Sequence, residues 1–213
     1  MVKKLNNGQC SNGSSTVSDI DGNIYHIVSI GGQCWLKENL KTRHYKNGLP
    51  ITTLTNNLNW QNVTYGAVCN YDNIASNSQT YGKVYNWYSV ADPSGLCPTR
   101  WHVPTDGEWT TLIDFLGVGA VAGGAMKEIG VLHWASPNFG STNSSDFTAL
   151  GAGHRNDDGT YQDLGFTGIW WTSTNYSSTG DWAQNIEIQN IGTGIGGNLV
   201  PKTFGYSVRC VHD

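Results

Sequence analysis

The chain has 213 residues, with 12 Lys or Arg against 16 Asp or Glu, so its net charge at pH 7 is −4, and its length allows one domain with a sizeable core. It has no run of basic residues to neutralise phosphates and no window near the roughly 18 apolar residues of a membrane span, so we expect neither nucleic acid binding nor direct membrane insertion. Charged residues make up only 13%, against roughly 25% in an average soluble protein, which favours a secreted or cell-surface domain; a cytoplasmic location stays open.

Residues 1–17 are polar and rich in Gly and Ser, with little to bury. They are predicted to form a flexible leader before one domain that spans residues 18–213. The first residues are basic, but the apolar segment of a signal peptide does not follow them. An exported form would therefore need a signal that this sequence lacks.

The first structured element is predicted to be a β-hairpin. A turn at Asp21-Gly22 opens an apolar run over Ile24–Ile30, Gly31-Gly32 makes the next turn, and Gln33–Leu40 returns as a second strand. From Lys41 to Thr80 no period persists, so this segment is expected to be a long irregular connection.

Two helices are predicted next. The first covers Tyr81–Ala91, where apolar residues recur at helical spacing, and it ends at Asp92-Pro93. The second begins at Thr105, which forms a capping box with Glu108. The buried stripe of this second helix is expected to consist of Trp109, Leu112, Ile113 and Leu116.

The remainder of the chain is predicted to contain a helical turn at Met126–Ile129 and several short strands. The strands are expected at Phe147–Leu150, Gly168–Thr174, Trp182–Gln189 and Phe204–Val211. Because strands and helices do not alternate as βαβ units, the fold class is predicted to be α+β.

Four motifs, "GKVYNWYSV", "LCPTRWHVPTDGEWTTL", "IWWTST" and "FGYSVRCV", occur in this order along the chain. Together they resemble the Fibrobacter succinogenes major paralogous domain, a bacterial family similar to the C-type lectin-like fold. The resemblance extends from Asp19 to Asp213. It implies two helices flanking a small antiparallel sheet, with extensive loops displayed on this scaffold.

Five cysteines match no zinc-binding spacing. The resemblance implies a disulfide between Cys97 and Cys210. Family members often carry a further cysteine just before the "YGKVYNW" motif, and this chain has none there. Cys69 is therefore expected to be unpaired or to pair with Cys10 or Cys34.

No motif for a catalytic or metal site is present. The six histidines form no HExxH pattern, and neither a nucleophile elbow nor a phosphate-binding loop occurs. We therefore expect no enzymatic activity, no metal and no cofactor. The main enzymatic alternative is an oxidase similar to the formylglycine-generating enzymes, which share the fold and need a reactive thiol with copper or another cofactor.

Two tripeptides partly match the calcium ligands of sugar-binding C-type lectins: Ser136–Asn138 ("SPN") and Arg155–Asp157 ("RND"). Because Ser136 replaces a needed carboxylate, two unrelated turns are the favoured interpretation. Asp157-Asp158-Gly159 is likewise expected to be a hairpin turn.

The polar segment from Asn156 to Asn198 is predicted to display a binding surface, because Tyr and Trp supply rigid contact area and Asn, Ser and Gly supply adaptable hydrogen bonds. Trp87, Trp101 and Trp109 are expected in the core, whereas Trp171 or Trp182 can be exposed beside the loop "TSTNYSSTGD". The candidate ligand-binding residues are Asn156, Tyr161, Trp171, Asn175, Tyr176, Asp181, Trp182, Asn185 and Asn190.

The resemblance also extends to variable proteins of diversity-generating retroelements, in which adenine-directed mutagenesis rewrites Asn codons. It would make the Asn, Tyr and Asp candidates variable, and Trp171, Trp182, Gln184 and Glu187 fixed. The expected function is recognition of, or adhesion to, a protein or glycan of unknown identity. A purely structural surface domain is a further alternative.

Overall fold

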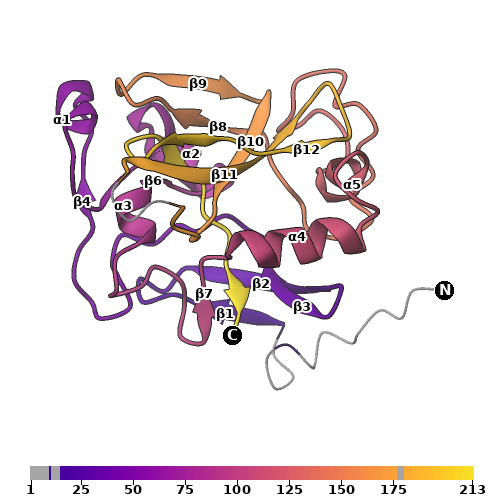
Figure 1. Cartoon of the computed structure of the whole chain (residues 1–213), viewed down its shortest axis with the longest axis horizontal. Helices are drawn as coiled ribbons and strands as arrows, with labels where there is room; N and C mark the ends of the chain where they lie inside the picture. Colours follow the sequence, from indigo (N-terminus) through magenta and orange to yellow (C-terminus); the bar gives the residue numbers. More distant parts are fainter. Residues whose placement is uncertain (1–9, 11–14, 177–179) are drawn as a thin grey trace.

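The computed structural model describes residue 10, residues 15–176 and residues 180–213. Within them the fold is α+β, with two sheets, short helices and long loops (Figure 1). Five α-helices lie in this part of the chain, so the expected pair of helices was too few. They are α1 (Asn57–Gln61), α2 (Ala75–Tyr81), α3 (Trp87–Val90), α4 (Asp106–Phe115) and α5 (Ala122–Met126), with a 3₁₀ turn η2 (Tyr71–Asn73).

The smaller sheet brings the two ends of the domain together. Its strands, in the order β1-β2-β3-β15-β7, are all paired antiparallel. They are β1 (Thr16–Ser18), β2 (Ile24–Ile30), β3 (Gln33–Leu36), β15 (Val211–His212) and β7 (Trp101–His102). The predicted hairpin is confirmed as β2 and β3, with Val28 opposite Trp35.

The larger sheet has ten strands and curls around the core, in the order β12-β11-β10-β8-β14-β6-β5-β4, with β13 on β11 and β9 on β8. Most pairs are antiparallel, but β8 with β10 and β4 with β5 are parallel. The strands are β4 (Thr52–Thr53), β5 (Ala67–Cys69), β6 (Val84–Asn86), β8 (Ala152–Arg155), β9 (Tyr161–Leu164), β10 (Thr167–Trp171), β11 (Trp182–Gln189), β12 (Ile195–Gly196), β13 (Leu199–Pro201) and β14 (Gly205–Tyr206).

The helix predicted over Tyr81–Ala91 is wrong. Gly82 ends α2 at a positive φ of 80°, and the chain then forms β6. Val84 and Tyr85 pack in different cores, as alternate residues of a strand do. The side chain of Asn86 accepts a hydrogen bond from the backbone N–H of Ser89 and so starts the single turn of α3. Pairing with β5 and β14 therefore overrides the local helical spacing.

Other sequence predictions hold in part. The segment expected to be irregular contains β4, α1, β5, η2 and most of α2. The predicted turn at Met126–Ile129 begins where α5 ends. Strand β11 has the predicted bounds. Strand β10 begins one residue before its predicted start and ends three residues before its predicted end, and Phe204–Val211 divides into β14 and the start of β15. Among the described residues, Phe147–Leu150 forms only an isolated bridge, from Ala149 to Lys127.

Strand β10 separates two hydrophobic cores. Ile169 and Trp171 lie in one core with Trp87 and Trp101, whereas Trp170 lies in the other with Trp109. Successive side chains of a strand point to opposite faces, so the run of apolar residues in β10 serves both cores. The expected burial of Trp87, Trp101 and Trp109 is confirmed, with exposed fractions of 4%, 2% and 0%.

Two disulfides join distant parts of the chain. Cys97 pairs with Cys210, as the resemblance implied, and Cys10 pairs with Cys34. Cys69 is a free, buried cysteine. Two disulfides are typical of an oxidising, extracellular environment.

The expected leader lies partly outside the described residues. Within the described part, Cys10 is buried and joined to β3 by its disulfide, and Thr16–Ser18 pair with β2. The ordered chain thus includes residues before 18, because a covalent bond and a strand pairing hold them.

Helix α4 begins with the predicted capping box. The Thr105 hydroxyl accepts a hydrogen bond from the backbone N–H of Glu108, and the Glu108 carboxylate accepts one from the backbone N–H of Thr105. The same carboxylate is 2.8 Å from Nε2 of His102, whose Nδ1 is 2.7 Å from Asp213. One acidic side chain therefore links α4 to β7.

This carboxylate makes stability depend on pH. Burial alone would raise the pKa of Glu108, but the hydrogen bonds from Thr105 and His102 outweigh it and hold the pKa below the usual 4.5. The resulting stabilisation is complete above the unfolded-state pKa and is lost as the pH falls through the folded-state pKa. We expect the melting temperature of the wild type to fall more steeply than that of Glu108→Gln from about pH 5 to about pH 3. Equal slopes in thermal denaturation would contradict this role.

Candidate functional site

A polar and aromatic surface lies where β11, β13 and the start of α4 meet. We call it the ribbon face and define it by Asp106, Tyr176, Trp182, Gln184 and Leu199. Gln184 is paired with Leu199 in the antiparallel β11–β13 ladder, and Trp182 is two residues from Gln184. Opposite residues of a ladder and alternate residues of a strand share a face. These three side chains therefore lie on one side of the ribbon.

The large side chains of the ribbon face are open to solvent. The exposed fractions of Tyr176, Trp182 and Leu199 are 49%, 53% and 51%. Trp182 and Tyr176 flank residues 177–179, the part of the predicted loop that lies outside the described residues. Of the two tryptophans that the sequence placed beside this loop, Trp182 is the exposed one.

Asp106 holds two members of the ribbon face in place. Its Oδ2 accepts a hydrogen bond from the Tyr176 hydroxyl at 2.7 Å, and its Oδ1 accepts one from Nε2 of Gln184 at 3.0 Å. The bond to Asp106 raises the pKa of Tyr176. Asp106 is the first residue of α4, where the helix dipole favours a negative charge. The carboxylate thus connects a rigid helix to an exposed tyrosine.

Asn156 and Tyr161 lie elsewhere, on the hairpin of β8 and β9, which β10 separates from β11. Asn156 bonds Thr160, and the Tyr161 hydroxyl donates to Oδ1 of Asn73 at 3.0 Å. The predicted turn at Asp157-Asp158-Gly159 is confirmed, with Gly159 at a φ of 88°. The nine candidates therefore do not form one surface.

Three candidates are in the interior and were wrongly placed on a surface. Trp171 is fully buried, and its Nε1 donates to the carbonyl of Tyr85. Asn185 is 1% exposed, and its Oδ1 accepts a hydrogen bond from the backbone N–H of Asn198. Asn190 is 4% exposed and donates to the carbonyls of residues 135 and 136. These asparagines satisfy loop backbone groups, as buried polar side chains must.

Asn175, Tyr176, Asp181 and Trp182 are exposed, as a display surface requires. The sequence prediction missed Asp106 and Leu199. Asp106 stands within the capping motif, so its sequence context indicated only a helix start. Its contact with Gln184, which is 78 positions away, has no local signal.

The two lectin-like tripeptides have structural roles. The Arg155 guanidinium is buried over the ring of Trp60, at 4.3 Å, and donates to the carbonyls of Leu54 and Gly159. Nδ2 of Asn138 donates to the carbonyls of Glu128 and residue 130. Within the ranges that the structure describes, no group of three or more His, Cys, Asp or Glu side chains could hold a metal ion.

A buried ammonium lies close to the first tripeptide. Nζ of Lys127 donates to the carbonyls of Phe139, Gln189 and Gly192 at 2.8 to 3.1 Å. Lys127 is fully buried, and this burial lowers its pKa to about 8. The ammonium joins the loop after "SPN" to the end of β11.

The thiol of Cys69 lies in a third, smaller hydrophobic cluster, together with Trp60 and Tyr71. Burial raises the pKa of this thiol. The nearby Tyr161 hydroxyl and Arg155 guanidinium lower it, but by less than burial raises it. A reactive thiol needs a depressed pKa and access to solvent, and this thiol has neither.

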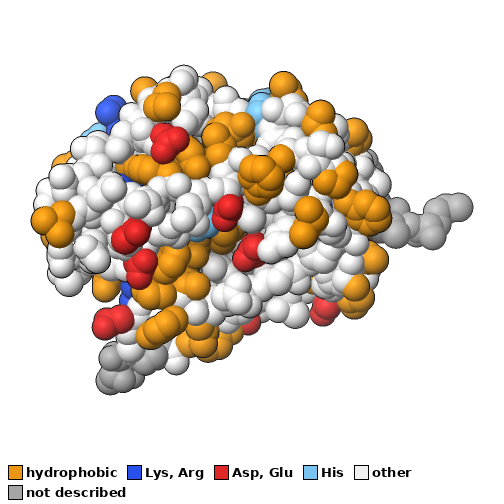
Figure 2. All heavy atoms as spheres, turned by 90° about the horizontal axis from the view of Figure 1, so that it is seen from above, with side chains coloured by type: hydrophobic (Ala, Val, Ile, Leu, Met, Phe, Trp, Pro, Cys, Tyr) orange, Lys and Arg blue, Asp and Glu red, His pale blue; other side chains and the backbone are white. Residues whose placement is uncertain are grey.

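The upper face of the molecule carries a mixed surface. Figure 2 shows hydrophobic and acidic side chains spread over it, with few Lys or Arg in view and no cluster of them. This face offers no concentrated positive charge to a polyanion.

Comparisons with known proteins give one result. The sequence model of the Fibrobacter succinogenes major domain matches residues 28–212. Searches of curated proteins and of solved structures give no match. None of the helices in the described part of the chain has the length and apolar character needed to cross a membrane.

Proposed function

Since the chain belongs to the Fibrobacter succinogenes major domain family, we propose that it is a non-enzymatic recognition or adhesion protein that binds a protein or glycan through the ribbon face. The observation that carries this proposal is the arrangement around Asp106. Two aromatic side chains are half exposed, and Tyr176 is held by a carboxylate that Gln184 also bonds.

Binding through such a surface has a clear physical basis. Tyr and Trp bring large contact areas and lose little side-chain entropy, because each has only two rotatable angles. A tyrosine that is already oriented by Asp106 loses less still when a ligand binds. Gln184 adds hydrogen-bonding groups that suit hydroxyl-rich or peptide ligands.

We extend the proposal to fold type, variation and location. The capped helix, the disulfide between the segments before β7 and β15, and the long C-terminal loops support a C-type lectin-like fold. If the protein is the variable protein of a diversity-generating retroelement, variation is expected at exposed Asn175, Tyr176 and Asp181. It is not expected at Asn185 or Asn190, whose side chains bond loop backbone.

The two disulfides support secretion or display at the cell surface.

The alternative functions have less support. An oxidase similar to formylglycine-generating enzymes needs a reactive thiol, whereas Cys69 is buried with a raised pKa and Cys97 and Cys210 are joined. A purely structural surface domain does not require the half-exposed rings of Trp182 and Tyr176, or the carboxylate of Asp106 that bonds Tyr176.

The test is a binding comparison with a matched control. A glycan array and a panel of immobilised cell-surface proteins first supply a ligand for the wild type. The double variant Tyr176→Ala/Trp182→Ala should then bind that ligand at least about thirtyfold more weakly, as expected for hot-spot aromatic residues. Its melting temperature should change little, because both side chains are half exposed.

The control is Tyr65→Ala, which removes a tyrosine of similar exposure, 53%, far from β11 in the sequence. This variant should bind like the wild type. Tyr176→Phe keeps the ring but deletes the hydrogen bond to Asp106. A loss of affinity between that of the wild type and that of the double variant would measure how much the orientation of the ring by Asp106 contributes to binding. Unchanged binding by the double variant would place the ligand elsewhere and reject the ribbon face.

A further inference from the structure

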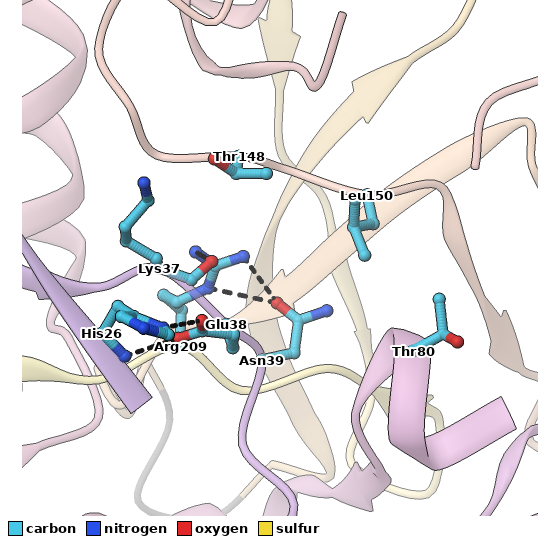
Figure 3. A pocket seen from close by; sticks show the side chains of 8 residues that line it. All are labelled: His26, Lys37, Glu38, Asn39, Thr80, Thr148, Leu150 and Arg209. Carbon is cyan, nitrogen blue, oxygen red and sulfur yellow. Dashed lines mark hydrogen bonds and ion pairs between the residues drawn. The ribbon is translucent and has the colours of Figure 1, made fainter. Parts of the chain in front are cut away.

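A polar cavity lies between the start of β2, the segment after β3, the end of α2, the segment before β8 and the segment before β15. Its volume is 310 Å³. Apart from Leu150, the side chains that line it are polar or charged (Figure 3): His26, Lys37, Glu38, Asn39, Thr80, Thr148 and Arg209. None of them belongs to the ribbon face.

Arg209 is a buried cation at the wall of this cavity. Its side chain is fully buried, and burial lowers its pKa to about 9. Nε and Nη2 both donate to Oδ1 of Asn39, and Nη1 donates to the carbonyls of Leu36, Lys37 and Phe147. Each Nη carries two N–H groups, so one N–H of Nη2 has no acceptor among the described residues.

The nearest carboxylate does not neutralise this guanidinium. Within the described chain Arg209 forms no ion pair, and both oxygens of Glu38 bond His26, one through the ring at 2.7 Å and one through the backbone N–H at 2.8 Å. Glu38 acts on Arg209 only without a direct bond: its negative charge raises the pKa of the guanidinium less than burial lowers it, so the buried cation is not fully compensated. The cavity is therefore positioned to receive a negative charge.

Lys37 adds a second cation to the same space. Its Nζ has no hydrogen-bond or ion-pair partner in the part of the chain that the structure describes, and Figure 3 shows it extending beside Arg209 toward Thr148. The hydroxyl of Thr80 is a further donor on the wall, whereas that of Thr148 already donates to the carbonyl of Asp146. With two positive side chains and one negative side chain, the lining has one net positive charge when His26 is neutral.

We propose that this cavity binds a small monovalent carboxylate, with the carboxylate accepting hydrogen bonds from Nη2 of Arg209 and Nζ of Lys37. A single negative charge matches the net charge of the lining. A dianion such as sulfate would exceed it and would be repelled by Glu38. The carboxylate is expected on a free small acid or on an acidic side chain or terminus of a peptide, which present the same group.

The test uses the full chain labelled with ¹⁵N, and sodium acetate as the probe at constant ionic strength. Acetate should shift the Nε–H resonance of Arg209 saturably, and sulfate should do so only at higher concentration. Lys37→Met should weaken acetate binding at least about tenfold, because a charge-assisted hydrogen bond is lost. The same change at Lys41, which does not line the cavity, should leave the binding unchanged.

Lys37→Met should fold normally because its side chain has no partner to lose, and its melting temperature checks this. Glu38→Gln provides a second test, since it raises the net charge of the lining and should shift the preference from acetate toward sulfate. The proposal is overturned if acetate produces no saturable shift, if Lys37→Met binds acetate like the wild type, or if Glu38→Gln leaves the preference unchanged. Acetate and a tripeptide with a free C-terminus, compared in the same assay, distinguish the two sources of the carboxylate.

Discussion

Replacing both Cys97 and Cys210 with Ala should lower the free energy of unfolding by about 5 kcal/mol in the chain-entropy model. The bond closes a loop with a sequence separation of 113 and joins the segment before β7 to the segment before β15. Unfolded chains without it gain the entropy of that loop. Both cysteines are also buried, so the substitution removes packing in the core that contains Trp87 and Trp101.

The Cys10–Cys34 bond provides the control, because its sequence separation is only 24. Removing it with two Ala substitutions should cost about 3.5 kcal/mol in the same model. Urea denaturation of the two double variants measures both values. If the Cys10–Cys34 variant were the less stable one, loop length would not determine the contribution of these bonds.

The elements that could be predicted from the sequence are those with local signals. The β2–β3 hairpin has a Gly-Gly turn between two apolar runs, and α4 has a capping box followed by a buried stripe. In both cases the residues that determine the structure lie within a few positions of one another. Local pattern and tertiary packing agree there, so the prediction holds.

The Tyr81–Ala91 segment failed because its pattern fits two structures. Apolar residues three and four positions apart suit a helix, but Val84 and Tyr85 are equally suited to a strand that is buried on both faces. The partners that decide, β5 and β14, are distant in sequence. No local signal could have supplied them.

The candidate site was predicted in part for a similar reason. Composition correctly indicated an exposed surface near Tyr176 and Trp182, but it could not separate Asn175 from Asn185. An exposed Asn and an Asn that bonds a loop backbone have the same sequence signature. Only the register of β11 places Asn185 where its Oδ1 receives the backbone N–H of Asn198.

A buried cluster of tryptophans holds α4 in place beside the exposed surface that includes Tyr176. Trp35, Trp109 and Trp170 form one buried cluster with Phe147, with ring centroids 4.8 to 6.1 Å apart. This cluster fixes α4 against the large sheet. Because Asp106 begins α4, the same packing fixes the carboxylate that orients Tyr176. The core therefore orients the exposed ring of Tyr176 through Asp106, although the sequence around Tyr176 is rich in Asn, Ser and Gly.

The second large effect is expected at the centre of that cluster. Trp109 is fully buried, so Trp109→Ala should lower the free energy of unfolding by about 3–5 kcal/mol, through lost burial and an uncollapsed cavity. The melting temperature should fall by about 10 °C for a chain of this length. Thr105→Ala, which removes only the cap of the same helix, should cost about 1 kcal/mol.

Trp109→Phe separates the ring from its N–H group. Nε1 of Trp109 is buried and has no hydrogen-bond partner among the described residues, so its removal forfeits no bond and relieves a desolvated donor. Phe also retains contact with Trp35 and Trp170, and its cost should stay below about 1.5 kcal/mol. Thermal and urea denaturation should therefore show that Trp109→Ala is far less stable than Trp109→Phe and Thr105→Ala. If Trp109→Phe lost as much stability as Trp109→Ala, the indole N–H would have to be bonded and a polar contact would hold the cluster. That result would contradict the view that apolar packing of Trp109 fixes the position of Asp106.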